Sequence, residues 1–412
     1  MKGFCTRRRF LQGIGATALL AAGGWSVAKP VLINPCRAAL PSELQASLWL
    51  AKVWQGLDVS KVWDCHTHLA GTGDSGSGVS IGSQLTSPFY PAQYAKRLFF
   101  LNAGCVRSAP GQADLSYVAR MRNLIDGMPA GFKTILFAFD HPYNEAGQAD
   151  LKNASLYVPN AYVRRLVAET PNMFEWAASI HPYRADALDA VHAAIADGAC
   201  AIKWLPPAMG MDPASTRCDA FYRVLAEHRL PLIVHCGKEE AVKGVHQQHL
   251  GNPLLLRRAL DAGVRVVVAH CASYGNDKDI DNAGKHLPSF DLFARLLAEP
   301  RARGLLHADI SAVILNKRPL LVLKTLLERE DWHPVLLNGS DYPVPGILPL
   351  ISPARLAREG LLPEEAVRDL ELIREHNPLL FDIAVKRLLS WQGKKFPASV
   401  FETRSFFERK KA

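Results

Sequence analysis

The sequence lacks several features that would assign it to a specialised class of protein. Outside the N-terminal segment its basic residues are interspersed with acidic ones, apart from a short Lys410-Lys411 ending, so a basic stripe for nucleic acid is not expected. It also lacks internal repeats and low-complexity linkers, which excludes a solenoid. What remains is a chain of 412 residues with 49% hydrophobic content, enough to bury one large core.

Acidic residues are absent from the first 28 positions, where Lys2 and Arg7-Arg8-Arg9 supply four positive charges. The apolar run over 13–28 contains four glycines. It is shorter than the about 20 strongly apolar residues of a membrane-spanning helix, which argues against a permanent anchor. The pattern resembles a twin-arginine export signal, so we expect recognition by the twin-arginine export machinery and a periplasmic or secreted protein.

Small residues at Ser26-Val27-Ala28 and at Cys36-Arg37-Ala38 offer two places for cleavage. A segment left uncleaved would tether the protein to the membrane, whereas no stable membrane partner is expected after processing. We therefore divide the chain into a leader (1–40), a main domain (41–390) and a C-terminal tail (391–412) that docks on this domain or on a second subunit.

The chain has eight cysteines, which raises the question of disulfides in an exported protein. Four of them lie in apolar runs next to polar residues of interest and are predicted to be small buried side chains directed toward surrounding helices: Cys65, Cys200, Cys236 and Cys271. Cys105 and Cys218 lie outside these runs, and the sequence leaves open whether they pair.

Apolar runs alternate with segments of helical periodicity along most of the chain. Helices are expected near 185–197, 218–228, 253–262, 291–297 and 319–330. Strands are expected near 62–68, 133–139, 174–180, 199–205, 231–237, 264–271, 304–311 and 334–341. Eight such units predict an α/β fold, the (β/α)₈ barrel.

The first connection, over 69–132, is too long for an ordinary crossover between two strands. It begins with the glycine-rich stretch 71–78, and helical patterns follow over 90–101 and 115–125. An inserted segment after strand one is therefore predicted, serving either as a lid over the site or as a surface insertion.

Polar residues recur at the carboxyl ends of the predicted strands, where barrel enzymes assemble their sites. Asp64-Cys65-His66-Thr67-His68 places two imidazoles on one face of the first strand. The later strands contribute Lys203 (strand four), His235 (strand five), His270 (strand six) and Asp341 (strand eight). Imidazoles and a carboxylate in this arrangement predict a site for a divalent metal, with zinc as the expected ion.

This order of residues resembles that of the amidohydrolase superfamily over roughly residues 60–385. The sequences His181-Pro182-Tyr183-Arg184 and Asn377-Pro378-Leu379-Leu380-Phe381 are most similar to its amidohydrolase-related branch. The resemblance implies that His66, His68, His235 and Asp341 hold a metal, and that His270 completes a second site or acts nearby.

Lys203 has two interpretations. In related barrels with two metals, a lysine at this place is carbamylated and bridges the ions. In the one-metal branch, it pairs with a carboxylate, although the next inward position there is often histidine and here is Leu205. One ion and two ions therefore both remain open.

The expected activity is hydrolysis of an amide, ester or lactone of a small-molecule substrate, with Asp341 as general base for water activated by the metal and His270 assisting. A non-oxidative decarboxylase on the same barrel and a non-catalytic metal-binding barrel are the alternatives. Further residues lie near predicted strand ends or on strand seven and are candidate pocket or substrate contacts: Asp140, His141, His181, Arg184, Trp204, Tyr274, His307 and Asp309.

Overall fold

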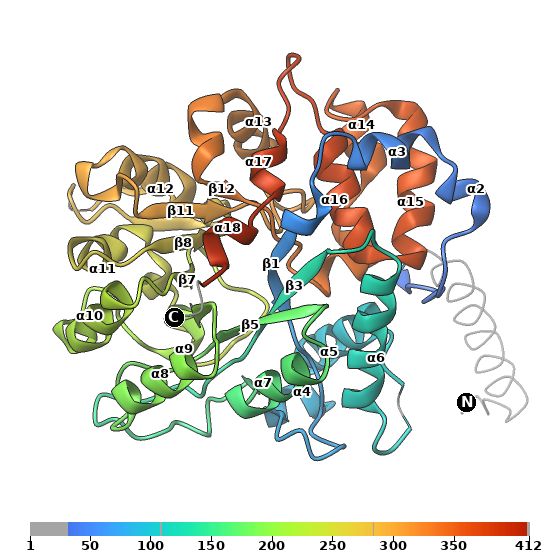
Figure 1. Cartoon of the computed structure of the whole chain (residues 1–412). Coiled ribbons are helices and arrows are strands. Elements are labelled where there is room, and N and C mark those ends of the chain that lie inside the picture. The colour runs from blue at the N-terminus through green and yellow to red at the C-terminus, as the bar shows by residue number, and fades with distance from the viewer. Residues whose placement is uncertain (1–31, 108, 283, 410–412) are drawn as a thin grey trace, which may run out of the picture.

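A computed structural model describes residues 32–107, 109–282 and 284–409. The predicted leader residues before 32 lie outside this range. Eight parallel strands form a barrel, with helices between successive strands on its outside (Figure 1). All eight predicted strands are confirmed, as β1 (Trp63–His68), β3 (Lys133–Phe137), β5 (Phe174–Ala178), β6 (Ala201–Trp204), β7 (Leu232–His235), β8 (Val266–Ala269), β11 (Leu306–Asp309) and β12 (Leu336–Leu337).

The strands pair in chain order from β1 to β12, as expected when each crossover returns to the neighbouring position. Their central residues are buried and mostly apolar, because a barrel strand is covered on both faces. Two short antiparallel pairs lie outside the barrel: β2 (Ser80–Ile81) with β4 (Leu156–Tyr157), and β9 (Asn276–Lys278) with β10 (His286–Pro288).

The barrel closes where β1 meets the segment that follows β12. Cys65 N donates to the Asn338 carbonyl at 3.1 Å, and His68 N donates to the Tyr342 carbonyl at 2.8 Å. Between them, Asp341 N donates to the His66 carbonyl at 2.8 Å. A Cβ at Gly339 would lie 2.5 Å from the His66 Cβ, so this close approach requires glycine.

The predicted helices over the later crossovers are confirmed, with the 253–262 segment beginning as a 3₁₀ turn. Among the described residues, no helix has the length and apolar character to cross a membrane. The helices outside the inserted segment and the C-terminal tail are α2 (Ser42–Gln45), α3 (Leu48–Trp54), α7 (Asn160–Glu169), α8 (Ala187–Ala196), α9 (Pro206–Met209), α10 (Asp219–Glu227), α11 (Arg257–Asp261), α12 (Ser289–Ala298), α13 (Leu320–Glu328), α14 (Pro353–Arg358), α15 (Val367–His376) and α16 (Pro378–Leu388).

A register shift between Asp64 and Thr67 interrupts the pairing of β1 with β3. Such a bulge changes which side chains face inward. Cys65 accordingly belongs to the apolar cluster that also contains Ile135, Ile233 and Val267, instead of pointing outward as predicted. Cys200 joins the same cluster, whereas the predicted placement of Cys236 and Cys271 among the outer packing residues is confirmed.

The insertion after β1 forms α4 (Ser83–Thr86), α5 (Pro91–Ala103) and α6 (Ala113–Asp126), so its predicted helices are confirmed. Its glycine-rich stretch folds around the buried Asp114. The Asp114 carboxylate accepts hydrogen bonds from Thr72 N at 2.6 Å and from the Ser77 hydroxyl at 2.5 Å. This polar anchor fixes the start of the insertion to α6.

The C-terminal tail docks on the barrel, which was one of the two predicted alternatives. It contains α17 (Ala398–Phe401) and α18 (Arg404–Phe407), which lie in front of the strands in Figure 1. Asn338 N donates to the Val400 carbonyl at 2.7 Å, and Phe407 is 1% exposed within the cluster inside the barrel. The tail thus covers the end of the barrel opposite to the carboxyl ends of the strands.

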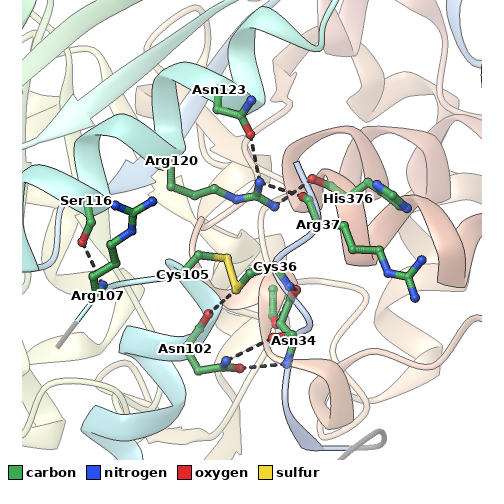
Figure 2. The surroundings of a disulfide bond; sticks show 11 residues. Asn34, Cys36, Arg37, Asn102, Cys105, Arg107, Ser116, Arg120, Asn123 and His376 are labelled. Carbon is green, nitrogen blue, oxygen red and sulfur yellow. Dashed lines mark hydrogen bonds between the residues drawn. A yellow bond between two sulfur atoms is a disulfide. The ribbon is translucent and has the colours of Figure 1, made fainter. Parts of the chain in front are cut away.

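The segment that begins at residue 32 is joined to the turn after α5 by a disulfide between Cys36 and Cys105 (Figure 2). Beside it, Asn34 N donates to the Asn102 side chain at 2.8 Å, and the Asn34 amide donates to the Gly346 carbonyl at 3.2 Å. The question left open by the sequence is therefore answered: Cys105 pairs with Cys36, and Cys218 is buried and free. The segment braces α5 against the loop after β12.

Replacing both Cys36 and Cys105 with serine should lower stability by about 2–4 kcal/mol, because the bond closes a long loop in the unfolded chain. Urea denaturation measures this change. Adding reductant should destabilise the wild type to the same extent and leave the double variant unchanged. A wild type that is insensitive to reductant would contradict the bond.

Candidate metal centre

A cavity of about 970 Å³ opens at the carboxyl ends of the barrel strands. Its walls include side chains from α5 of the insertion, such as Lys96, Phe99 and Phe100. The insertion therefore faces the cavity, as the lid interpretation expects. All six residues predicted for the metal site lie in its lining: His66, His68, Lys203, His235, His270 and Asp341.

His66 and His270 are oriented by two residues of the seventh strand and its loop, Asp309 and Ser311. His66 Nδ1 lies 2.9 Å from Asp309 Oδ2, and His270 Nδ1 lies 2.7 Å from Ser311 Oγ. Asp309 Oδ1 also accepts from His270 N at 2.9 Å. A histidine held at Nδ1 presents Nε2 as the free donor atom, which is the usual arrangement around a protein-bound metal.

Asp341 places its carboxylate between the two histidines of β1. Its Oδ1 lies 3.0 Å from His68 Nε2 and 3.7 Å from His66 Nε2. One ligand atom each from His66, His270 and Asp341 lie within 4.8 Å of one another. The backbone at Asp341 is left-handed, with φ of 63°, a conformation that costs energy outside glycine and occurs often at functional sites.

His235 is buried beside His270, with ring centroids 5.4 Å apart. Its Nε2 is buried and forms no hydrogen bond within the described part of the chain. Glu239 Oε2 lies 3.3 Å from this atom without the alignment of a hydrogen bond. Glu239 was missed by the sequence analysis, because it lies in the loop after β7, where no strand pattern fixes its direction.

Lys203 lies at the floor of the cavity, and its Nζ is 3.4 Å from His66 Nε2. Burial lowers the pKa of the Lys203 ammonium, while Asp309, Asp341 and Glu239 oppose this change. No carboxylate of the described residues lies within ion-pairing distance of Nζ. Lys203 therefore does not form the direct ion pair with a carboxylate that is expected for the one-metal branch.

The histidines have the protonation that a metal requires. Burial lowers the pKa of the His66, His235 and His270 imidazoles well below the usual range. These rings are therefore neutral at pH 7 and can donate a lone pair. Together with the unpartnered Nε2 of His235 and the carboxylate of Asp341, they fit a divalent ion of the zinc type.

Several other polar residues considered from the sequence do not line the cavity. His307 lies near Leu305 and Phe406 at the opposite end of β11. The ring of His181 hydrogen-bonds to the backbone of Met209 and Tyr183. Asp140, His141, Arg184, Trp204 and Tyr274 are likewise outside the lining. Of this group, Asp309 reaches the site, as support for the ligands.

Removing the support for His66 and His270 should weaken metal binding. We expect Asp309→Ala to lower zinc affinity about 10- to 100-fold, because both histidines lose a partner that fixes their orientation. Competition with a fluorescent zinc chelator measures the affinity. The matched control is His307→Gln on the same strand, which should bind zinc like the wild type; equal affinity in both variants would contradict the role of Asp309.

The barrel region of the chain is similar to known proteins. A model of the amidohydrolase family matches residues 63–366. None of the curated proteins compared with the chain matches it. Similar solved structures include an uncharacterized TIM-barrel protein from Bordetella bronchiseptica, with 17% identity, a TM-score of 0.45, and coverage of 76% of this chain and 98% of that one.

A probable 2-pyrone-4,6-dicarboxylic acid hydrolase from Acinetobacter baumannii has 13% identity and a TM-score of 0.41, with 81% of this chain and 97% of that one covered. A 4-oxalomesaconate hydratase from Rhodopseudomonas palustris has 12% identity and a TM-score of 0.41, with 84% and 95% covered. The family model spans the barrel from the start of β1 to the turn before α15. The chain belongs to the amidohydrolase family.

Proposed function

We propose that this protein is a metal-dependent hydrolase acting on an amide, ester or lactone of a small molecule. The observation that carries the proposal is the position of Asp341, whose carboxylate faces His66 and His68 at the floor of a large cavity. A divalent ion bound there would polarise the carbonyl group of the substrate and lower the pKa of a bound water molecule. A closed structural site would need no carboxylate exposed to a cavity.

The ion would be held by Asp341, His66 and His270, whose ligand atoms lie within 4.8 Å of one another, with His235 as a further donor and a position left open for water. His66 and His270 contribute preorganised donors, since Asp309 and Ser311 fix their rings before any ligand arrives. His68 is more accessible than His66, with 30% of its side chain exposed against 1%. We therefore place His68 on the side of the site that faces the substrate.

Asp341 would act as the general base and then as the general acid. Its carboxylate takes a proton from the attacking water and returns it to the leaving oxygen or nitrogen of the substrate. The side chain is 13% exposed, so it can reach a water in the cavity while its backbone stays fixed to β1.

We propose that one ion suffices and that Lys203 is unmodified. Lys203 Nζ lies 3.4 Å from His66 Nε2, and its burial favours the neutral amine. A neutral amine at this position avoids repulsion by the ion and can donate a hydrogen bond to the substrate. Carbamylation of Lys203 with a second ion is the competing arrangement.

Asp341→Asn should reduce hydrolysis about 100-fold or more, because the amide cannot accept the proton. The assay is a panel of small esters, lactones and anilides with the zinc-loaded protein, run in ¹⁸O-labelled water. The exposed residue Asp291 provides the matched control, as Asp291→Asn should leave the rate unchanged.

The isotope readout separates the alternatives. Hydrolysis places one solvent oxygen in the product, whereas a decarboxylase acting on added aromatic acids releases carbon dioxide and places a solvent proton on carbon. Persistent hydrolysis in Asp341→Asn with zinc still bound would overturn the assigned base. Zinc binding without turnover of any substrate by the wild type would favour the non-catalytic barrel.

We further propose that the protein works outside the cytoplasm, in the periplasm or as a secreted enzyme. The disulfide between Cys36 and Cys105 supports this location, because such bonds persist in oxidising compartments. It also favours cleavage after Ala28, since cleavage after Ala38 would separate Cys36 from the main chain of the mature protein.

Replacing the twin arginines, Arg7→Lys together with Arg8→Lys, should retain the protein in the cytoplasm, whereas Arg9→Lys should leave export unchanged. Fractionation followed by N-terminal sequencing checks both points. The exported protein should begin at Lys29. A mature protein that begins at Ala39 would contradict the proposed cleavage site, and export of the double variant would contradict the signal.

A further inference from the structure

Arg318 is a buried cation in the cavity wall that the sequence analysis did not identify. The residue is 7% exposed and lies in the loop between β11 and α13. Its Nη1 donates to the Ser273 hydroxyl, and its Nε is buried with no hydrogen-bond partner in the described residues. No carboxylate of the described residues lies within ion-pairing distance of this guanidinium.

A buried guanidinium without a carboxylate is costly, because arginine does not lose its charge and burial removes the water that would stabilise it. An anionic ligand bound beside Arg318 would offset this cost. The accessible part of Arg318 belongs to the cavity wall, so that anion would enter through the cavity.

The other charges of the cavity favour the same kind of ligand. Positive side chains outnumber carboxylates in its lining, and the three carboxylates are those of Glu239, Glu240 and Asp341. Glu240 pairs with Lys238 at 2.8 Å and with Lys317 at 2.9 Å, so it is already engaged. Apart from Lys203, the remaining cations of the lining are Lys96, Arg97, Lys243 and Arg318. This excess attracts anions toward the site.

We propose that Arg318 is a specificity-determining residue that binds a carboxylate of the substrate. The proposal rests on the proposed function and narrows its substrate class to small carboxylic acids that also contain the ester, lactone or amide to be cleaved. The guanidinium N–H groups of Arg318 that do not bond to Ser273 would donate hydrogen bonds to the planar carboxylate.

The arrangement has a consequence for orientation. The hydrogen bond from Arg318 to Ser273, three residues after His270, places its charge on the His270 side of the cavity. Asp341 contacts His68 on the β1 side. A substrate held through its carboxylate by Arg318 therefore extends its reactive group toward Asp341, and neutral analogues would lose this orientation.

The test is binding of succinate and phthalate, compared with their neutral diamides, by isothermal titration calorimetry. It uses the full chain in a zinc-loaded and a chelator-treated form. We expect the metal-free wild type to bind the dicarboxylates and not the diamides. Arg318→Met should weaken this binding about tenfold or more, since a charged hydrogen-bonded contact is lost. Added salt should weaken the wild-type binding.

Two further variants keep the outcome interpretable. Arg318→Lys keeps the charge and should bind more weakly than the wild type but better than Arg318→Met. Arg368→Met removes an exposed arginine of α15 and should bind like the wild type. Circular dichroism and thermal melting verify that each variant is folded.

Equal binding by folded Arg318→Met and the wild type in the metal-free form would overturn the proposal. The wild type could instead bind inorganic phosphate more tightly than the dicarboxylates and lose this binding in Arg318→Met. That result would contradict a carboxylate as the ligand, although Arg318 would still form an anion site. Either result leaves the hydrolytic function intact, because that function is tested by ¹⁸O incorporation in the zinc-loaded protein with Asp341→Asn.

Discussion

Closure of the barrel between β1 and the segment after β12 is the constraint on which the site depends. Three backbone hydrogen bonds join these segments, and the middle one runs from Asp341 N to the His66 carbonyl. The same contact thus completes the barrel and brings the carboxylate beside the imidazoles. Gly339 permits it, because any side chain there would collide with His66. A change that weakens the contact between β1 and the segment after β12 would therefore also displace Asp341 from the histidines.

The sequence predicted the barrel and the set of residues at the site for a clear physical reason. Each strand is covered on both faces, so it reads as an apolar run, and a polar residue at its carboxyl end stands out. His235 and His270 were identified in this way. The same reasoning is limited to strands, and it failed for Cys65, where a bulge in β1 reverses the expected direction of the side chain.

Residues in loops could not be placed from the sequence. Arg318 and Glu239 lie beyond the strand ends, where no periodicity fixes their direction, yet both line the cavity. Conversely, His181 follows a strand and turns into the protein, where its ring meets backbone groups. The disulfide joins Cys36 to a residue 69 positions away. Such a pairing depends on the folded position of α5, which sequence spacing does not reveal.

The central claim is that the neutral histidines and Asp341 form a centre for one divalent ion. The most direct test is the metal-to-protein ratio of the purified protein, prepared without chelators and measured by elemental mass spectrometry. The account predicts one ion per chain. Two ions per chain, together with a carbamylated lysine, would contradict the single centre with an unmodified Lys203. No bound ion after reconstitution with zinc, manganese or iron would contradict the metal centre itself.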